Sequence, residues 1–282
     1  MAAIDFLNPA PLMWDFEHAP DSQRLASRYE IAYTTPAKCA RQLVSGEADF
    51  GLVPVAALAA TPSLVVVPDC AIASLDYVRS ILLVVRPTEG VTAVRRVALD
   101  TSSLTSSTYT RILFQRFWKT SVEFVPHAPD LESMLAMADA AMLIGDPALL
   151  ALEDSEGRRR RTGEALLYLD LAHEWRQFTG LPWISAFWAL RREALAESGI
   201  SAQTLIEDLQ LSRDHGVAHV ADLAAEWSGR IALSTDAIRS YLTTNIHYFL
   251  DKSCLSGLEA FYRYAEECKA LPSVPPLALL ET

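Results

Sequence analysis

Short apolar runs separated by polar turns dominate the first half of the chain. Such runs are typical of buried strands, and they occur at residues 3–7, 31–33, 50–53, 97–99 and 141–144. Several of them are followed by apolar side chains at helical spacing, at residues 36–45, 104–117 and 131–137. Strands and helices that alternate in this way predict an α/β fold.

Two pairs of segments repeat the same order of elements. Residues 46–58 and 137–150 each contain a helix end, an Ala-Asp joint, an apolar strand and a proline-marked turn, and residues 3–14 resemble residues 97–113 as strand, turn and helix. We therefore expect two lobes of similar plan. In open α/β sheets ligands bind beyond the carboxyl ends of the strands, so the four polar turns should face a common cleft. Two independent small domains are the alternative.

Two extended apolar stretches, at residues 81–85 and 185–190, are expected to join the lobes as hinges. This prediction assigns residues 1–84 and 188–282, with the C-terminal helices, to lobe I and residues 85–187 to lobe II.

Before the first hinge we expect two short strands, at residues 65–67 and 72–74, and then a polar break. Arg79 and Ser80 in this break lie where the chain crosses the cleft. The Arg79 guanidinium could serve a ligand carboxylate, or it could equally form a salt bridge at the hinge.

The turn that precedes the helix at residue 104 is rich in hydroxyl groups, with Ser103, Thr105, Ser106 and Ser107. The start of a helix presents unpaired backbone N–H groups and the positive end of the helix dipole, so it can bind a carboxylate without a lysine. The alternative is that these residues only cap the helix, because Ser and Thr are common N-cap residues.

The second half of the chain is mostly helical in pattern, with helices expected at residues 195–198, 202–212, 217–227, 235–249 and 256–270. The arginine run at residues 158–161 has acidic neighbours and is expected to be a solvated loop. His215, His219 and His247 are expected to be surface or packing residues rather than metal ligands.

Composition narrows the classes of function. The chain has 282 residues, 51% of them hydrophobic, and a formal net charge of −11, which argues against a nucleic-acid partner. Because the protein as a whole is negative, a site that binds an anion would need a local source of positive potential.

The four cysteines lie far apart and form no C-x-x-C pair, which favours neither a zinc site nor disulfide bonds, and no dinucleotide-binding glycine fingerprint occurs. Without a signal-peptide pattern or a membrane-spanning apolar run, we expect a cytoplasmic protein without a membrane partner.

Several motifs in order give the chain a resemblance to a known family. FLNPAPL, GEADFGLVPV, VPDCAIAS, VRSILL, VALDTSSLTS, ADAAMLIGDPAL and YLTTNIHY together resemble the chorismate dehydratases, the first enzymes of the futalosine route to menaquinone. The resemblance implies a two-lobe fold like the type II periplasmic binding proteins, with a ligand cleft between the lobes. It also implies dehydration of a small-molecule substrate, chorismate, to 3-[(1-carboxyvinyl)oxy]benzoate, with no metal or organic cofactor.

By position in these motifs, Asn8 and Ser80 correspond to the polar residues beside the reacting ring, and the ligand-contacting turns supply Ser103, Thr105, Ser106, Gly145 and Asp146. The matched turns contain no histidine, lysine or cysteine, so we favour proton abstraction by the substrate's own enolpyruvyl carboxylate. A non-catalytic binding protein for a small carboxylate is the competing hypothesis. A third hypothesis, a ligand-sensing regulator, lacks support because the sequence shows no basic helix that could read DNA. The oligomeric state is left open.

Overall fold

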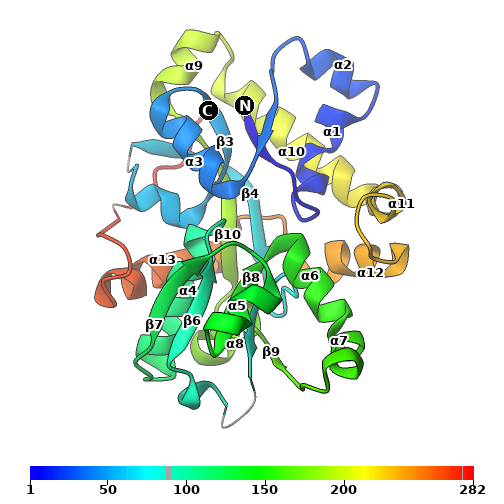
Figure 1. The fold of residues 1–282 in the computed structure, drawn as a ribbon. Coiled ribbons are helices and arrows are strands. Elements are labelled where there is room, and N and C mark those ends of the chain that lie inside the picture. The colour runs from blue at the N-terminus through cyan, green and yellow to red at the C-terminus, as the bar shows by residue number, and fades with distance from the viewer. Residues whose placement is uncertain (62, 87–89, 275) are drawn as a thin grey trace.

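The computed structural model describes residues 1–61, 63–86, 90–274 and 276–282, which fold around two five-stranded sheets (Figure 1). The first sheet has the order β2-β1-β3-β10-β4, with β1 (Ala2–Ile4), β2 (Ala32–Thr34), β3 (Phe50–Pro54), β4 (Leu64–Ser74) and β10 (Trp183–Arg191). The second has the order β7-β6-β8-β5-β9, with β5 (Ile81–Val85), β6 (Arg96–Asp100), β7 (Glu123–His127), β8 (Ala140–Ile144) and β9 (Leu167–Asp170). We call the parts built on them the first-sheet lobe and the second-sheet lobe.

The two sheets share one plan. In each, the second strand lies parallel to both neighbours, β1 between β2 and β3 and β6 between β7 and β8. The next strand runs antiparallel, β10 beside β3 and β5 beside β8. The repeat predicted from the sequence is therefore confirmed. All residues of β3, β5 and β8 are buried, as expected of strands that helices cover on both faces.

Helices cover the sheets and connect their strands. Those before β9 are η1 (Ala10–Met13), α1 (Trp14–Glu17), α2 (Asp21–Leu25), α3 (Pro36–Ser45), η2 (Val55–Ala59), η3 (Val91–Ala93), α4 (Leu104–Ile112), the π-helical η4 (Leu113–Phe117), α5 (Leu131–Met137), α6 (Gly145–Glu153) and α7 (Ser155–Thr162). Those after it are α8 (Leu171–Thr179), α9 (Arg192–Ser198), α10 (Ala202–Ala218), α11 (Val220–Ser228), α12 (Thr235–Ser240), the π-helical η5 (Tyr241–Asn245) and α13 (Lys252–Glu267).

The predicted hinges are wrong in detail. Residues 81–85 form β5 within the second sheet, and residues 185–190 lie in β10 within the first sheet. Both stretches are apolar because they are interior strands. The chain passes between the sheets at residues 75–80 and 180–182 instead.

The two short strands expected before the first passage form one strand, β4. The polar residues in its middle do not end it, because Asp69 takes a left-handed conformation with φ of 60° and the pairing with β10 shifts its register. The buried guanidinium of Arg213 on α10 bonds to the Asp69 carboxylate at 3.1 Å and lies over the Phe249 ring, which holds this irregularity in place.

The arginine run lies in a helix, α7, rather than a loop, although Arg159, Arg160 and Arg161 are exposed to solvent as expected. Arg158 is buried and forms ion pairs with Glu132 at 2.6 Å and Glu164 at 2.8 Å. A buried arginine needs such partners, and here one comes from α5 and the other from the segment that follows α7.

The helix expected at residues 235–249 is shorter than predicted. It consists of α12 and η5, and the backbone of His247 then exchanges hydrogen bonds with Ala73 of β4 at 2.8 and 2.9 Å. A backbone that pairs with a strand edge cannot also make helical hydrogen bonds.

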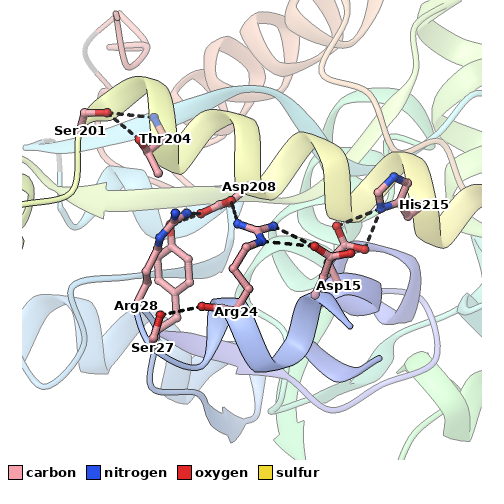
Figure 2. A network of polar contacts seen from close by, with 10 residues as sticks. Asp15, Arg24, Ser27, Arg28, Ser201, Thr204, Asp208 and His215 are labelled. Atoms are coloured by element: carbon pink, nitrogen blue, oxygen red, sulfur yellow. Dashed lines mark hydrogen bonds and ion pairs between the residues drawn. The ribbon is translucent and has the colours of Figure 1, made fainter. Parts of the chain in front are cut away.

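Polar contacts attach α10 to the helices that follow β1 (Figure 2). The buried carboxylate of Asp208 accepts hydrogen bonds from Arg24 at 3.0 Å and Arg28 at 2.8 Å, and Asp15 bonds to His215 at 2.8 Å. Gly216 allows α10 to approach η1 closely, since a Cβ there would lie 2.0 Å from the Pro11 carbonyl oxygen. These contacts fix the segment that contains the first polar turn.

Candidate functional site

The four polar turns meet in one cavity, as predicted. Its walls include Asn8 after β1, Pro54 at the end of β3, the start of α4, and Gly145 after β8. Ser80, in the passage between the sheets, lies in the same wall. The cavity measures about 50 Å³.

The walls are mainly apolar, with a few polar side chains and no charged ones among the described residues. Among the described residues that line the cavity, no side chain carries an ionisable group. The polar side chains in its walls are those of Asn8, Ser80, Ser103, Thr105, Ser106 and Ser185. Binding here must therefore use hydrogen bonds and backbone dipoles.

The start of α4 provides more hydroxyl groups than its cap uses. Ser103 is the N-cap, and its Oγ accepts from Ser106 N at 3.0 Å and donates to Ser106 Oγ at 3.0 Å. Thr105 Oγ1 accepts from Ala56 N at 3.2 Å. Within the described part of the chain, neither Thr105 Oγ1 nor Ser106 Oγ donates a hydrogen bond, so both hydroxyl protons can point to a ligand. Capping and anion binding are thus compatible.

Asn8 has an unused hydrogen-bonding atom. Its Oδ1 is buried and finds no hydrogen-bond partner among the described residues. An unpaired buried carbonyl oxygen costs free energy, and one in a cavity wall is expected where a ligand supplies the missing donor.

Backbone contacts hold the turn that presents Ser80. Gly145 N donates to Ser80 O at 2.7 Å, and Arg79 N donates to the Asp170 carboxylate at 2.6 Å. Arg79 has a φ of 60°, a conformation that arginine rarely adopts without such support. Burial raises the pKa of Asp170, and the backbone N–H groups of Arg79 and His173 counteract this rise.

Two of the predicted binding residues point elsewhere. The Arg79 side chain forms an ion pair with Glu153, which corresponds to the alternative of a hinge salt bridge and gives no support to a role in binding. Asp146 Oδ1 accepts from Leu7 N at 3.3 Å. Burial raises the pKa of Asp146, whereas this hydrogen bond lowers it.

Direct contacts join the lobes around the cavity. Asp146 binds the backbone of the first-sheet lobe, and so does Thr105 through Ala56 N. A Cβ on Gly145, whose φ is 64°, would lie 3.2 Å from the Phe6 ring, so only glycine allows this approach. The lobes are therefore closed on each other.

Sequence reasoning missed three buried residues that support these turns. Tyr241 on η5 donates to Ser80 Oγ at 2.8 Å. Asp170 holds the Arg79 backbone, and Asp100 accepts from Ser102 N at 2.8 Å and Ile144 N at 3.3 Å. Asp100 and Asp170 each follow an apolar run, which was an available signal, but nothing local points from Tyr241 to Ser80.

Folding also brings together two groups of side chains that could bind a metal ion. They are His247 with Asp251 and Cys254, and Asp15 with Asp21 and His215. Neither group lines the cavity. In both, a histidine already bonds to a carboxylate, His247 to Asp251 at 2.9 Å and His215 to Asp15 at 2.8 Å.

Among the described residues, none of the helices combines the length and apolar character needed to cross a bilayer.

Sequence comparisons find a matching family and a relative of this chain. The family model described as "Menaquinone biosynthesis" matches residues 1–267. A chorismate dehydratase of Thermus thermophilus is 29% identical over 256 residues, which cover 88% of this chain and 89% of that protein.

Solved structures support the fold. A protein of Archaeoglobus fulgidus superposes with a TM-score of 0.71 at 15% identity, covering 96% of this chain and 97% of that one. A Candida albicans gene product described as having the generic periplasmic binding protein fold gives a TM-score of 0.65 at 12% identity, with 97% and 90% covered. The predicted two-lobe α/β fold is confirmed.

Proposed function

This chain belongs to the menaquinone biosynthesis family, and from that premise we propose that it is a lyase that dehydrates chorismate to 3-[(1-carboxyvinyl)oxy]benzoate. The similarity to the Thermus thermophilus chorismate dehydratase supports this activity. The observation that carries the proposal is the cavity wall, which offers several hydroxyl groups and one unpaired amide oxygen but no ionisable side chain among its described residues. Such a wall suits a reaction in which the substrate supplies its own base.

The reaction removes a proton from one ring carbon and the hydroxyl group from its neighbour. The electron pair of the broken C–H bond completes the aromatic ring as the C–O bond breaks, and the hydroxyl leaves as water once it receives the proton that the substrate carboxylate took from the ring carbon. The enolpyruvyl carboxylate of the substrate lies close to the proton and accepts it. Because aromaticity drives the step, the protein needs to orient the substrate more than to provide a strong base.

Asn8 and Ser80 are the residues that we assign to the chemistry. The Asn8 amide can donate to a carboxylate or to the leaving oxygen and, through its unpaired Oδ1, accept from the substrate hydroxyl. The Ser80 hydroxyl already accepts from Tyr241, so its own O–H can donate a hydrogen bond to the leaving oxygen.

The start of α4 is proposed to bind a substrate carboxylate. Thr105 and Ser106 offer hydroxyl donors there, Ser103 holds the turn, and Gly145 shapes the opposite wall. This local source of positive potential is needed because the net charge of −11 repels anions at long range. In this assignment Asp146 connects the two lobes and does not contact the ligand. Arg79 supports the turn that contains Ser80.

The wider setting is also proposed. We place the reaction at the first step of the futalosine route to menaquinone, in the cytoplasm, without metal, organic cofactor, nucleic-acid partner or membrane partner. For the expected division into lobe I at residues 1–84 and 188–282 and lobe II at residues 85–187, we propose boundaries moved to the passages at residues 75–80 and 180–182, because β5 belongs to the second sheet and β10 to the first.

A binding protein that closes on a small carboxylate without reaction is the second candidate, because the fold is that of periplasmic binding proteins. Incubation of the purified protein with chorismate, followed by ultraviolet spectroscopy and mass spectrometry, separates the two. We expect a product lighter by one water, with the same rate after treatment with a chelator. Chorismate that binds but returns unchanged would support the binding protein instead, and a rate restored by an added metal would contradict cofactor-free chemistry.

A further inference from the structure

Hydrogen bonds fix the backbone of Ser80 but not the direction of its hydroxyl group. Ser80 N donates to Val78 O at 2.7 Å, and Ser80 O accepts from Gly145 N at 2.7 Å. Rotation about the Cα–Cβ bond would still move the hydroxyl between three staggered positions. Whether its proton points into the cavity therefore depends on side-chain contacts.

Tyr241 supplies that contact. Its hydroxyl donates to Ser80 Oγ at 2.8 Å, and each of the two residues is 2% exposed. Burial raises the pKa of Tyr241, so its hydroxyl stays a donor at neutral pH. When Tyr241 occupies one lone pair of Ser80 Oγ, the Ser80 proton has to point elsewhere, and none of the described residues accepts it.

The π-helical turn η5 forms hydrogen bonds to the passage between the sheets at two points. Tyr241, at its start, binds Ser80, and Asn245, at its end, donates from Nδ2 to Tyr77 O at 2.9 Å. Single π-helical turns often occur at functional sites, because the extra residue re-aims side chains. Here the turn sets Tyr241 in register with Ser80, and Tyr241 itself does not line the cavity.

We propose that Tyr241 is a positioning residue that orients the Ser80 hydroxyl, so that Ser80 donates a hydrogen bond to the oxygen that leaves the substrate. This inference rests on the proposed dehydration and adds to it a residue that acts only through Ser80. A hydroxyl held in this direction before the substrate arrives needs no reorientation in the transition state, where the donated hydrogen bond is strongest.

The test compares Tyr241→Phe, Ser80→Ala and the double variant with a matched control, Tyr248→Phe. Tyr248 is also a buried tyrosine close in sequence, but its hydroxyl has no hydrogen-bond partner among the described residues, so its removal should leave turnover unchanged. For Tyr241→Phe we expect kcat to fall about tenfold, the effect of one lost hydrogen bond, with KM within about twofold of wild type. The double variant should be no slower than Ser80→Ala alone, because Tyr241 acts through Ser80.

Two results would overturn the inference while leaving the dehydration intact: wild-type kcat in Tyr241→Phe, or a double variant slowed by the product of the two single effects. If the wild-type protein does not convert chorismate, the proposed function fails, and crystal structures of the same variants decide the inference separately. Ser80 should keep its rotamer in Tyr248→Phe and change it in Tyr241→Phe. An unchanged Ser80 rotamer in Tyr241→Phe would refute the positioning role.

Discussion

The buried amide oxygen of Asn8 gives opposite expectations for stability and activity. Asn8→Ala removes a polar atom that has no partner among the described residues, so the melting temperature should stay the same or rise. Turnover of chorismate should fall more than binding, because orientation matters most in the transition state. Asn8→Asp places a negative charge beside a dianionic substrate, and binding should fail as well. Measurements of kcat, KM and melting temperature on the same preparations check this. A destabilised Asn8→Ala protein with a normal rate per folded molecule would make Asn8 a turn residue only.

The hydroxyl groups of α4 can be tested one at a time. Ser106→Ala removes a donor from the cavity wall but keeps the cap, because Ser103 Oγ still accepts from the backbone of residue 106. A hydrogen bond to a charged group contributes about 1.5–3 kcal/mol, so calorimetry should show affinity for chorismate reduced by at least about tenfold. Thr105→Val is less informative, since it also leaves Ala56 N unpaired.

Ser107→Ala is the matched control for this change. Its hydroxyl bonds to Ser103 O on the same helix and does not line the cavity, so affinity should remain that of wild type. If Ser106→Ala and Ser107→Ala bind chorismate with equal affinity, these hydroxyl groups only cap the helix.

At the scale of elements, the packing of α10 on η1 fixes the turn that carries Asn8. Gly216→Ala places a Cβ 2.0 Å from the Pro11 carbonyl oxygen, so the two elements have to separate. Overpacking of this kind costs about 1–3 kcal/mol. We expect a lower midpoint in urea unfolding and also slower turnover, because η1 follows the Asn8 turn directly.

Gly229→Ala provides the comparison for this change. The Cβ at that position would meet only Glu226 O at 3.5 Å, an ordinary contact, so stability and turnover should be close to wild type. If Gly216→Ala unfolds at the wild-type urea concentration, α10 does not constrain η1 in the way the structure indicates.

At the scale of the whole molecule, the lobes have to open before a substrate can enter. The cavity of about 50 Å³ is far smaller than the roughly 300–1,000 Å³ of pockets that hold small ligands. Among the described residues, the contacts that hold it shut include Asp146 to Leu7 N and Thr105 to Ala56 N, and water can replace both. Small-angle scattering of the free protein should therefore give a larger radius of gyration than this closed arrangement.

Chorismate should reduce that radius as the lobes close around it. Ser106→Ala should show the same decrease only at a higher ligand concentration. A free protein that already has the closed radius and converts chorismate without any change in scattering would contradict lobe opening.

The sequence by itself determined the local elements and their repeat. Helix α5 has the predicted limits at residues 131–137, and α4 begins where the hydroxyl-rich turn was expected to start a helix. These features depend on apolar periodicity and capping within about ten residues of chain, so local chemistry is sufficient. The convergence of the four turns also followed, because the carboxyl ends of parallel strands meet at one edge of a sheet.

Only the tertiary structure decided which side chains meet. Arg79 turned to Glu153 instead of the cavity, Arg158 became buried between two carboxylates, and Tyr241 reached Ser80 across 161 positions of chain. Each outcome depends on a pairing between segments that are distant in the sequence, where packing selects one side-chain rotamer and one partner among several. Apolar pattern could mark the interior strands β5 and β10, but it could not separate a buried strand from a hinge, because both are extended and apolar.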